Sequence, residues 1–260
     1  MQTDTQLQLA LISFDVAWEK PEANRTYLDG ILTTVAAHTD VVVLPEMFTT
    51  GFSMNPERIA EPEPGPTLYW MQAWAQRLDA MIIGSVAVEV QGLYYNRLYA
   101  VWPDGSYRTY DKRHLFAFAG EDAAYKAGQA RLVFDFRGFR LCPLICYDLR
   151  FPVFSRNTDQ FDVLLYVAQW PQVRAWAWNA LLTARAIENQ CYVVGVNRVG
   201  ADAKGIAYQG DSQVVDMLGQ PLLAAQQQTG VYQMGLSKKA RQEVLDRFPF
   251  YRDQDRFSLL

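Results

Sequence analysis

The chain has little of what several common kinds of site require. Its 260 residues include only three cysteines and two histidines, and their spacing does not fit a zinc site. Cysteines at positions 142, 146 and 191 are an odd number, so they do not form a disulfide framework. The formal net charge is −4 and no long basic run occurs, which argues against nucleic acid or an anionic membrane surface as the main partner.

Long apolar runs are also absent. No stretch reaches the ~18 residues that a membrane span needs, and residues 1–6 place no positive charge before the apolar residues 7–14. We therefore expect a protein without a membrane segment or an export signal. Unpaired cysteines suit a reducing compartment, so the cytoplasm is the expected location.

Strand and helix patterns alternate along the chain. Half of the residues are apolar, which is enough for a substantial core. Buried-strand patterns alternate with three helical patterns. The first ends at about residue 37, the second starts at residue 67, and the third covers residues 174–189. This order, without a linker, predicts one α/β domain over residues 1–260, with an arm at about 237–260. The strand patterns lie at 7–14, 40–46, 81–88, 94–102, 162–168 and 191–197.

Two of these strand patterns echo each other. Asp40-Val-Val-Val-Leu is similar to Asp162-Val-Leu-Leu-Tyr, although the match is too short to count as a repeat. The echo hints at two similar halves that face each other.

Cys146 lies where an apolar strand pattern ends. Residues 139–145 are mostly apolar, as in a strand buried on both faces, and a polar stretch follows directly. Ligands of open α/β sheets bind at the carboxyl ends of strands. Free cysteine usually behaves as a small buried hydrophobe, which is our interpretation of Cys142 and Cys191. The position of Cys146 is ambiguous by itself, and the residues found elsewhere in the chain make it a candidate nucleophile.

Three charged residues have contexts that suit catalysis. Glu46 ends a buried strand before an aromatic loop, where apolar surroundings disfavour a charged carboxylate and so make it a stronger base. Lys112 follows a strand and a turn, and Glu121 follows a glycine. Each could also be an ordinary solvated charge, so the interpretation depends on their combination with Cys146.

The combination resembles the nitrilase, or carbon–nitrogen hydrolase, superfamily. The family's signatures are similar to Leu44-Pro-Glu46-Met-Phe, Asp111-Lys112-Arg-His-Leu-Phe and Cys146-Tyr-Asp-Leu-Arg-Phe-Pro152, in this order. Residues 46–54 look most like the ω-amidase branch, which hydrolyses the terminal amide of 2-oxoglutaramate and related 2-oxo acid amides, including the methionine-derived one. The resemblance covers essentially the whole chain. It implies a four-layer αββα sandwich, a metal-free thiol amidase without a cofactor, and a homodimer.

The residue types then suggest a role for each member of the set. A free thiol is mostly protonated at neutral pH, so Glu46 would remove the Cys146 proton, pass it to the departing ammonia and later activate water. Lys112 would stabilise the developing oxyanion with the backbone N–H of Tyr147, and one such donor is worth ~3 to 4 kcal/mol. If the family pattern holds, Glu121 orients Lys112 or relays a proton.

The substrate pocket is predicted less sharply. The carboxylate of a 2-oxo acid needs a cation, because an unpaired buried charge is costly, and aromatic side chains would wall the pocket. The candidate cations are Arg113, Arg174 and Arg198, and the candidate wall residues are Phe48, Phe52, Trp170 and Tyr147.

Other polar residues near these motifs receive structural roles. We expect Asp148 and Arg150 to form a charge pair that fixes the turn after the nucleophile, and Glu188 to pair with Arg185 at i, i+3 spacing. Neither histidine has the context of a Cys-His protease, so histidine is not the expected base. A nitrilase or an N-carbamoyl hydrolase would use the same triad, and a catalytically silent binding relative is a further alternative.

Overall fold

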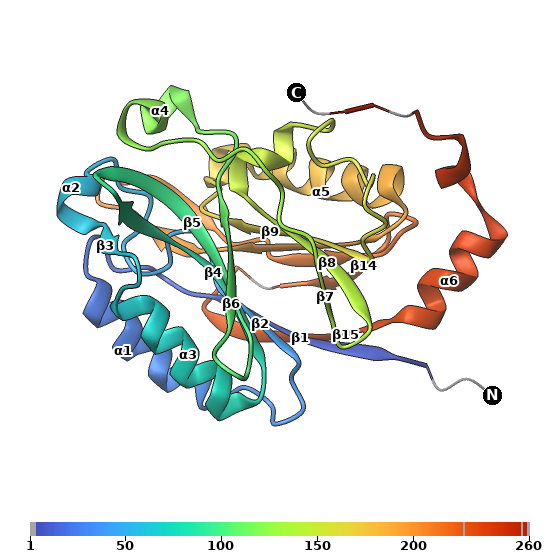
Figure 1. Cartoon of the computed structure of the whole chain (residues 1–260), viewed down its shortest axis with the longest axis horizontal. Helices are drawn as coiled ribbons and strands as arrows, with labels where there is room; N and C mark the ends of the chain where they lie inside the picture. The colour runs from blue at the N-terminus through green and yellow to red at the C-terminus, as the bar shows by residue number, and fades with distance from the viewer. Residues whose placement is uncertain (1–3, 226, 256, 259–260) are drawn as a thin grey trace.

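The computed structural model describes residues 4–225, 227–255 and 257–258. Two large β-sheets face each other and helices cover their outer sides (Figure 1). The first sheet has the order β15 (Gly230–Ser237), β1 (Gln6–Ser13), β2 (Val41–Val43), β4 (Met81–Val90), β5 (Leu93–Val101) and β6 (Tyr107–Asp111), with β3 (Glu61–Pro62) paired to β4. The second has the order β14 (Pro221–Ala224), β13 (Gln213–Val215), β10 (Tyr192–Asn197), β9 (Val163–Ala168), β8 (Phe139–Ile145) and β7 (Phe134–Phe136).

The remaining elements are helices and one hairpin. The longer helices are α1 (Pro21–Leu32), α3 (Pro66–Leu78), α5 (Ala175–Asn189) and α6 (Lys238–Arg247), and α2 (Pro56–Ile59) and α4 (Glu121–Ala124) are single turns. Short 3₁₀ helices are η1 (Ala117–Ala119), η2 (Cys146–Arg150), η3 (Gln172–Arg174) and η4 (Phe250–Asp253). The hairpin pairs β11 (Val199–Ala201) with β12 (Ala207–Gln209). Among the described residues, no helix is both long and apolar enough to cross a bilayer.

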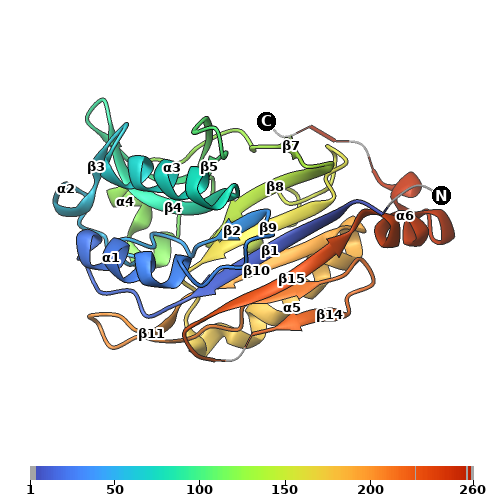
Figure 2. The ribbon, with the colours of Figure 1, turned by 90° about the horizontal axis from the view of Figure 1, so that it is seen from below.

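Alternation along β1 shows how the layers form. Leu9 and Leu11 point into the core between the two sheets, whereas Ala10 and Ile12 belong to the core under α1 and α3. The strand is apolar on both faces because both faces are covered. Figure 2 shows the two sheets between α1 and α3 on one side and α5 on the other.

The second sheet is covered by α5. Trp178, Leu182 and Ala186 of this helix join the core beneath it. Gly195 of β10 makes the close approach possible, because a Cβ there would lie 2.7 Å from the Trp178 ring and 2.6 Å from Leu182. The architecture is therefore the four-layer αββα sandwich that the resemblance implied.

The helix boundaries differ slightly from the prediction. The first helix ends at Leu32 rather than near residue 37. Thr33, Thr34 and Val35 follow Leu32 directly. Such β-branched side chains have low helix propensity. The predicted Arg185–Glu188 pair is confirmed at 3.0 Å. In the predicted arm, α6 and η4 lie beyond the last strand and curve away from the sheets (Figure 1).

Candidate active site

The candidate nucleophile occupies a strained turn. β8 ends at Ile145, and Cys146 begins η2 with a φ of +40°, in the left-handed region that costs a non-glycine residue about 1 kcal/mol or more. Asp148 Oδ2 compensates by accepting hydrogen bonds from the Ile145 N–H at 2.9 Å and the Tyr110 hydroxyl at 2.7 Å. A buried carboxylate thus holds the thiol at the carboxyl end of β8.

The predicted charge pair between Asp148 and Arg150 does not form. Asp148 Oδ1 instead accepts a hydrogen bond from the His114 backbone N–H at 3.1 Å and lies 2.8 Å from Nδ1 of that histidine. The Arg150 guanidinium lies over the Trp170 ring, 5.0 Å from its centroid. Residues two positions apart on a 3₁₀ turn point in different directions. Arg150 therefore faces the pocket rather than the turn.

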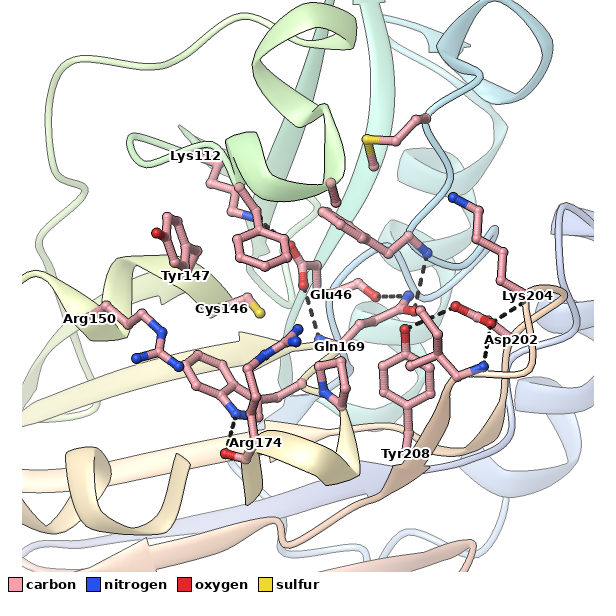
Figure 3. Close-up of a pocket in the computed structure, with 17 residues that line it drawn as sticks. Glu46, Lys112, Cys146, Tyr147, Arg150, Gln169, Arg174, Asp202, Lys204 and Tyr208 are labelled. Carbon is pink, nitrogen blue, oxygen red and sulfur yellow. Dashed lines mark hydrogen bonds and ion pairs between the residues drawn. The ribbon is translucent and has the colours of Figure 1, made fainter. Parts of the chain in front are cut away.

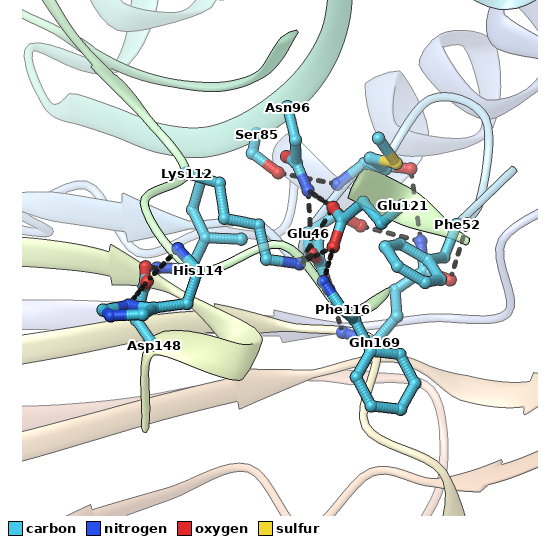
Figure 4. Close-up of polar contacts among 12 residues, drawn as sticks. Glu46, Phe52, Ser85, Asn96, Lys112, His114, Phe116, Glu121, Asp148 and Gln169 are labelled. Carbon is cyan, nitrogen blue, oxygen red and sulfur yellow. Dashed lines mark hydrogen bonds and ion pairs between the residues drawn. The ribbon is translucent and has the colours of Figure 1, made fainter. Parts of the chain in front are cut away.

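Glu46, Lys112 and Glu121 form a buried cluster (Figure 4), and each is at most 1% exposed. Lys112 Nζ donates to Glu46 Oε1 at 2.8 Å and to Glu121 Oε1 and Oε2 at 3.0 and 2.9 Å. Cys146 lines the same pocket as Glu46 and Lys112, and the charges of both residues act on its thiol. Four residues that are distant in the sequence thus meet at one point between the sheets.

Burial and charge set the protonation states of this cluster. Burial, and then the charge of Glu46, raises the pKa of the Cys146 thiol well above its ordinary value, against the opposing effect of Lys112. Burial would lower the pKa of Lys112, but the charges of Glu121 and Glu46 outweigh it and raise that pKa. At neutral pH the thiol is therefore protonated and the lysine is charged. Attack by sulfur needs a base, and Glu46 is the carboxylate that lines the same pocket and acts on the thiol through its charge.

The Glu121 carboxyl has its own support. Its Oε2 accepts a hydrogen bond from the Phe116 backbone N–H at 2.6 Å, besides those from Lys112. Burial raises the pKa of Glu121, although the charge of Lys112 acts in the opposite direction.

Both sheets orient Glu46. Its Oε1 accepts a hydrogen bond from Asn96 Nδ2 at 2.9 Å, and Asn96 lies on β5 of the first sheet. Its Oε2 accepts one from the Gln169 backbone N–H at 3.0 Å, and Gln169 follows β9 of the second sheet. The Gln169 side chain also donates to the Glu46 carbonyl oxygen at 2.8 Å. Glu46 is therefore fixed by neighbours from both halves.

A pocket opens beside the thiol (Figure 3). Four of the predicted site residues beyond the triad line it, namely Phe52, Tyr147, Trp170 and Arg174. Figure 3 shows Arg150 to the left of Cys146, Arg174 below it and Lys204 at the right of the pocket. The lining residues are Glu46, Phe52, Met54, Lys112, Phe116, Ala119, Cys146, Tyr147, Arg150, Gln169, Trp170, Pro171, Arg174, Asp202, Lys204, Ile206 and Tyr208.

Two predicted pocket residues lie away from this lining. Phe48 is fully buried under α3, where its ring lies 5.9 Å from that of Trp70, so it belongs to the core. Arg113 lies in the bend that follows Lys112 and is not among the residues that line the pocket. Its guanidinium donates to the Gly128 carbonyl at 3.3 Å.

Arg198 is also used elsewhere. It is fully buried, and its guanidinium donates to Asp15 Oδ1 at 2.7 Å and to the Val16 carbonyl at 3.2 Å. The Tyr208 ring lies 4.8 Å from it. Arg198 therefore ties the β11–β12 hairpin to the first sheet, and Arg174 is the predicted arginine that reaches the pocket.

The sequence analysis missed several residues of the pocket and of the buried cluster beside it. Gln169 ends a buried strand just as Glu46 does, and this shared position is the signal that could have identified it. Asn96 lies within a strand and Lys204 within a hairpin, where nothing distinguishes them from surface residues. Arg150 is part of the motif that follows Cys146, but the sequence analysis predicted that it would form a charge pair with Asp148.

Comparison with known proteins agrees with this geometry. The carbon–nitrogen hydrolase family model matches residues 6–244. The ω-amidase YafV of Yersinia enterocolitica is 47% identical over 98% of this chain and 99% of its own length, and the 2-oxoglutaramate amidase of Bacillus subtilis is 32% identical over 94% and 96%. The crystal structure of XC1258 from Xanthomonas campestris, a CN-hydrolase superfamily protein with an arsenic adduct in its active site, superposes with a TM-score of 0.96 at 44% identity, covering both chains completely.

These matches extend over nearly the whole chain and agree with the fold and with the contents of the pocket. The chain belongs to the carbon–nitrogen hydrolase family, whose members hydrolyse carbon–nitrogen bonds.

Proposed function

We propose that this chain is an ω-amidase that hydrolyses the terminal amide of 2-oxo dicarboxylic acid monoamides, with 2-oxoglutaramate and the methionine-derived 2-oxo acid amide as substrates. The names of the relatives from Yersinia enterocolitica and Bacillus subtilis favour this activity. The structural observation that carries the proposal is a pair of arginines in the pocket that holds the thiol.

The two arginines are placed to bind the substrate carboxylate. Arg150 lies over the Trp170 ring at 5.0 Å and Arg174 over the Phe116 ring at 5.2 Å. Stacking on an aromatic face holds a guanidinium in place and leaves its edge free to bind a carboxylate. The 2-oxo acid end would bind there, with the terminal amide at Cys146.

Among the described residues, the pocket lining offers no carboxylate without a hydrogen-bond partner to receive an α-ammonium group. Its acidic lining residues are Glu46, which binds Lys112, and Asp202. Asp202 is engaged within its own hairpin, accepting from the Lys204 and Ile206 N–H groups at 2.8 and 3.0 Å. An amino acid amide such as glutamine would bring its ammonium group next to cations. A 2-oxo acid lacks that group, so it is the preferred substrate.

Acylation of the enzyme begins with proton removal. Glu46 takes the proton of the Cys146 thiol as sulfur attacks the amide carbon. The oxyanion that forms is stabilised by Lys112 and by the backbone N–H of Tyr147. This N–H lies in the first turn of η2, where N–H groups have no partner within the helix. The carbon–nitrogen bond then breaks, nitrogen takes the proton from Glu46, and ammonia leaves.

Hydrolysis of the thioester returns the enzyme to its starting state. Glu46 removes a proton from water, and the hydroxide oxygen attacks the thioester carbon. When the tetrahedral intermediate collapses, the carbon–sulfur bond breaks and Cys146 recovers the proton from Glu46. The product is the 2-oxo dicarboxylic acid, and Glu121 keeps Lys112 in position throughout.

Ammonia release from 2-oxoglutaramate tests the proposal. The purified protein is compared with Cys146→Ala, and each is also given glutamine, asparagine and a simple nitrile. We expect rapid release from 2-oxoglutaramate, slow release from glutamine, and loss of both in the variant. Turnover of the nitrile or of an N-carbamoyl substrate in place of 2-oxoglutaramate would overturn the ω-amidase assignment and keep the triad.

Thiol alkylation separates an enzyme from a silent binding relative. Burial raises the pKa of both Cys142 and Cys191 to about 12, so these two should resist iodoacetamide. Cys146 lines the pocket and should react, at a rate that increases with pH because its raised pKa leaves little thiolate near pH 7. Uniform resistance of all three thiols would favour the silent relative.

We also infer a cytoplasmic homodimer. Three large apolar side chains beside the pocket are almost fully exposed: Phe118 at 88%, Val173 at 86% and Trp176 at 84%. Such a cluster favours a partner surface, and the three unpaired cysteines favour a reducing compartment. Sedimentation equilibrium that gives the mass of a single chain would contradict the dimer.

A further inference from the structure

One buried amide bridges the two carboxylates of the catalytic cluster. Asn96 is fully buried on β5, and its Nδ2 donates to Glu46 Oε1 at 2.9 Å and to Glu121 Oε1 at 3.2 Å (Figure 4). The Asn96 carbonyl oxygen also accepts a hydrogen bond from the Lys112 backbone N–H at 3.0 Å. This single residue therefore contacts each charged member of the cluster.

The lysine of the cluster has its hydrogen-bonding capacity filled. An ammonium group has three N–H donors, and Lys112 Nζ makes three hydrogen bonds, one to Glu46 and two to Glu121. To donate to an oxyanion, Lys112 must weaken one of these bonds. The bond to Glu46 weakens when Glu46 takes the thiol proton, because the carboxyl group then becomes neutral.

The orientation of the Asn96 amide is fixed by its neighbours. Its Oδ1 is buried and has no hydrogen-bond partner among the described residues, which costs about 1–3 kcal/mol. The flipped orientation would place Oδ1 against one oxygen of each carboxylate, which is repulsive. The amide therefore turns both of its N–H groups to the glutamates.

We propose that Asn96 is a positioning residue that keeps Glu46 in place while Lys112 transfers one hydrogen bond from Glu46 to the oxyanion. This inference rests on the proposed thiol amidase mechanism. The amide does not titrate, so it donates to Glu46 whether that carboxyl is charged or neutral. Without Asn96, the neutral Glu46 side chain loses its hydrogen bond from β5 of the first sheet. This loss occurs at the step in which Glu46 must return the proton to nitrogen.

Two variants of Asn96 test this role. Asn96→Ala removes both N–H donors, and Asn96→Asp places a third carboxyl group against the two glutamates with nearly unchanged shape. Around this position the charged and titratable groups are Glu46, Glu121, Lys112, Cys146 and Tyr125. We expect kcat on 2-oxoglutaramate to fall by roughly 100-fold in either variant, since small misplacements of catalytic groups have effects of that size. KM should stay within about 3-fold, because Asn96 does not line the pocket.

The pH profile distinguishes positioning from general destabilisation. In Asn96→Asp, three carboxyl groups surround one ammonium, which favours their protonated forms. The acid limb of kcat/KM should therefore move to higher pH. The matched control is Asn157, which is also buried and donates to the Phe161 carbonyl at 2.8 Å, away from the pocket. Asn157→Ala and Asn157→Asp should lower thermal stability without moving the acid limb.

Alkylation of Cys146 by iodoacetamide provides a readout that needs no substrate. At pH 7 we expect both Asn96 variants to react more slowly than the unmodified protein and the Asn157 variants. The alkylation rate does not depend on which amide is the substrate. If the protein does not turn over 2-oxoglutaramate but the Asn96 variants are alkylated more slowly, the ω-amidase assignment is rejected and the role of Asn96 is kept. Unchanged alkylation and an unmoved acid limb in Asn96→Asp, or losses of kcat that match the Asn157 controls, would overturn the inference.

Discussion

The central strands of the two sheets are built alike. β2 runs parallel to β1 and β4, and β9 runs parallel to β8 and β10. Each strand follows an aspartate that accepts a hydrogen bond from a backbone N–H of the neighbouring strand: Asp40 from Gln8 at 2.7 Å and Asp162 from Arg140 at 2.8 Å. The short sequence echo between them therefore marks equivalent positions in two similar sheets.

The two strands differ where they end. β2 leads to Glu46, a carboxylate, and β9 leads to Gln169, a neutral residue whose backbone N–H donates to that carboxylate. The surrounding framework is shared, but only one half supplies the proposed base. A carboxylate in place of the Gln169 side chain would put a second negative charge beside Glu46, whereas the Gln169 amide donates to the Glu46 backbone carbonyl at 2.8 Å. The difference shows how a repeated architecture can carry an asymmetric catalytic site.

Removing the carboxylate from the β2 end should have the largest effect. Glu46→Gln makes the two strand ends alike and leaves no base at the thiol, so kcat/KM should fall by about 10²–10⁴-fold. Steady-state ammonia release measures the loss, and circular dichroism checks the fold. Retention of more than a tenth of the activity would show that another group removes the thiol proton.

Adding a carboxylate at the β9 end should have the next largest effect. Gln169→Glu places a second negative charge beside Glu46 and replaces the N–H that donates to the Glu46 carbonyl. We expect kcat to fall by roughly 10- to 100-fold, since misplaced catalytic groups have effects of this order, together with a lower Tm. A variant with full activity would show that the Glu46 orientation does not depend on the second sheet.

Arg174 lies a few residues beyond Gln169 and tests what else the second sheet supplies. Loss of a charge-assisted hydrogen bond costs about 1.5–3 kcal/mol, so Arg174→Ala should raise KM for 2-oxoglutaramate by roughly 10- to 100-fold. Arg113→Ala is the matched control, because Arg113 is not among the residues that line the pocket. Equal effects of the two substitutions on KM would contradict carboxylate binding by Arg174.

The aspartates that precede the two strands should affect stability rather than chemistry. Asp162 is 2% exposed and pairs with the buried Arg241 at 2.7 Å, so Asp162→Asn should lower the free energy of unfolding by about 3–5 kcal/mol. Asp40 pairs with the half-exposed Arg137, and Asp40→Asn should lower it by about 1 kcal/mol. Urea unfolding measures both values. Equal losses would show that burial does not govern the difference.

The sequence singled out residues that the fold brings together, but it predicted the pocket lining less well. Glu46, Lys112 and Cys146 could be identified because each follows a strand pattern within a recognisable motif. The pocket depends on which way side chains point near these strand ends, and that direction is set by local turns. For this reason Arg150 does not pair with Asp148 as predicted. Arg198 instead donates a hydrogen bond to Asp15, which lies near the other end of the chain.

Contacts between distant segments could not be predicted from the sequence for a related reason. Asn96 has no motif around it, and its importance comes only from two glutamates that the fold places beside it. Strand and helix alternation predicted an α/β domain, the Asp40 echo hinted at two similar halves, and the family resemblance implied the four layers. They could not predict which residue of one sheet would hydrogen-bond to which residue of the other.

The pairing of β1 with β15 constrains how quickly the molecule can form. The two strands are antiparallel neighbours over eight residue pairs, from Gln6 opposite Ser237 to Ser13 opposite Gly230 (Figure 2). More than two hundred residues separate the partners, so closing this contact is entropically costly and slow. During synthesis, β1 presents an open edge until β15 has emerged. That interval is when an exposed strand edge is most prone to aggregation, and when a chaperone would be of most use.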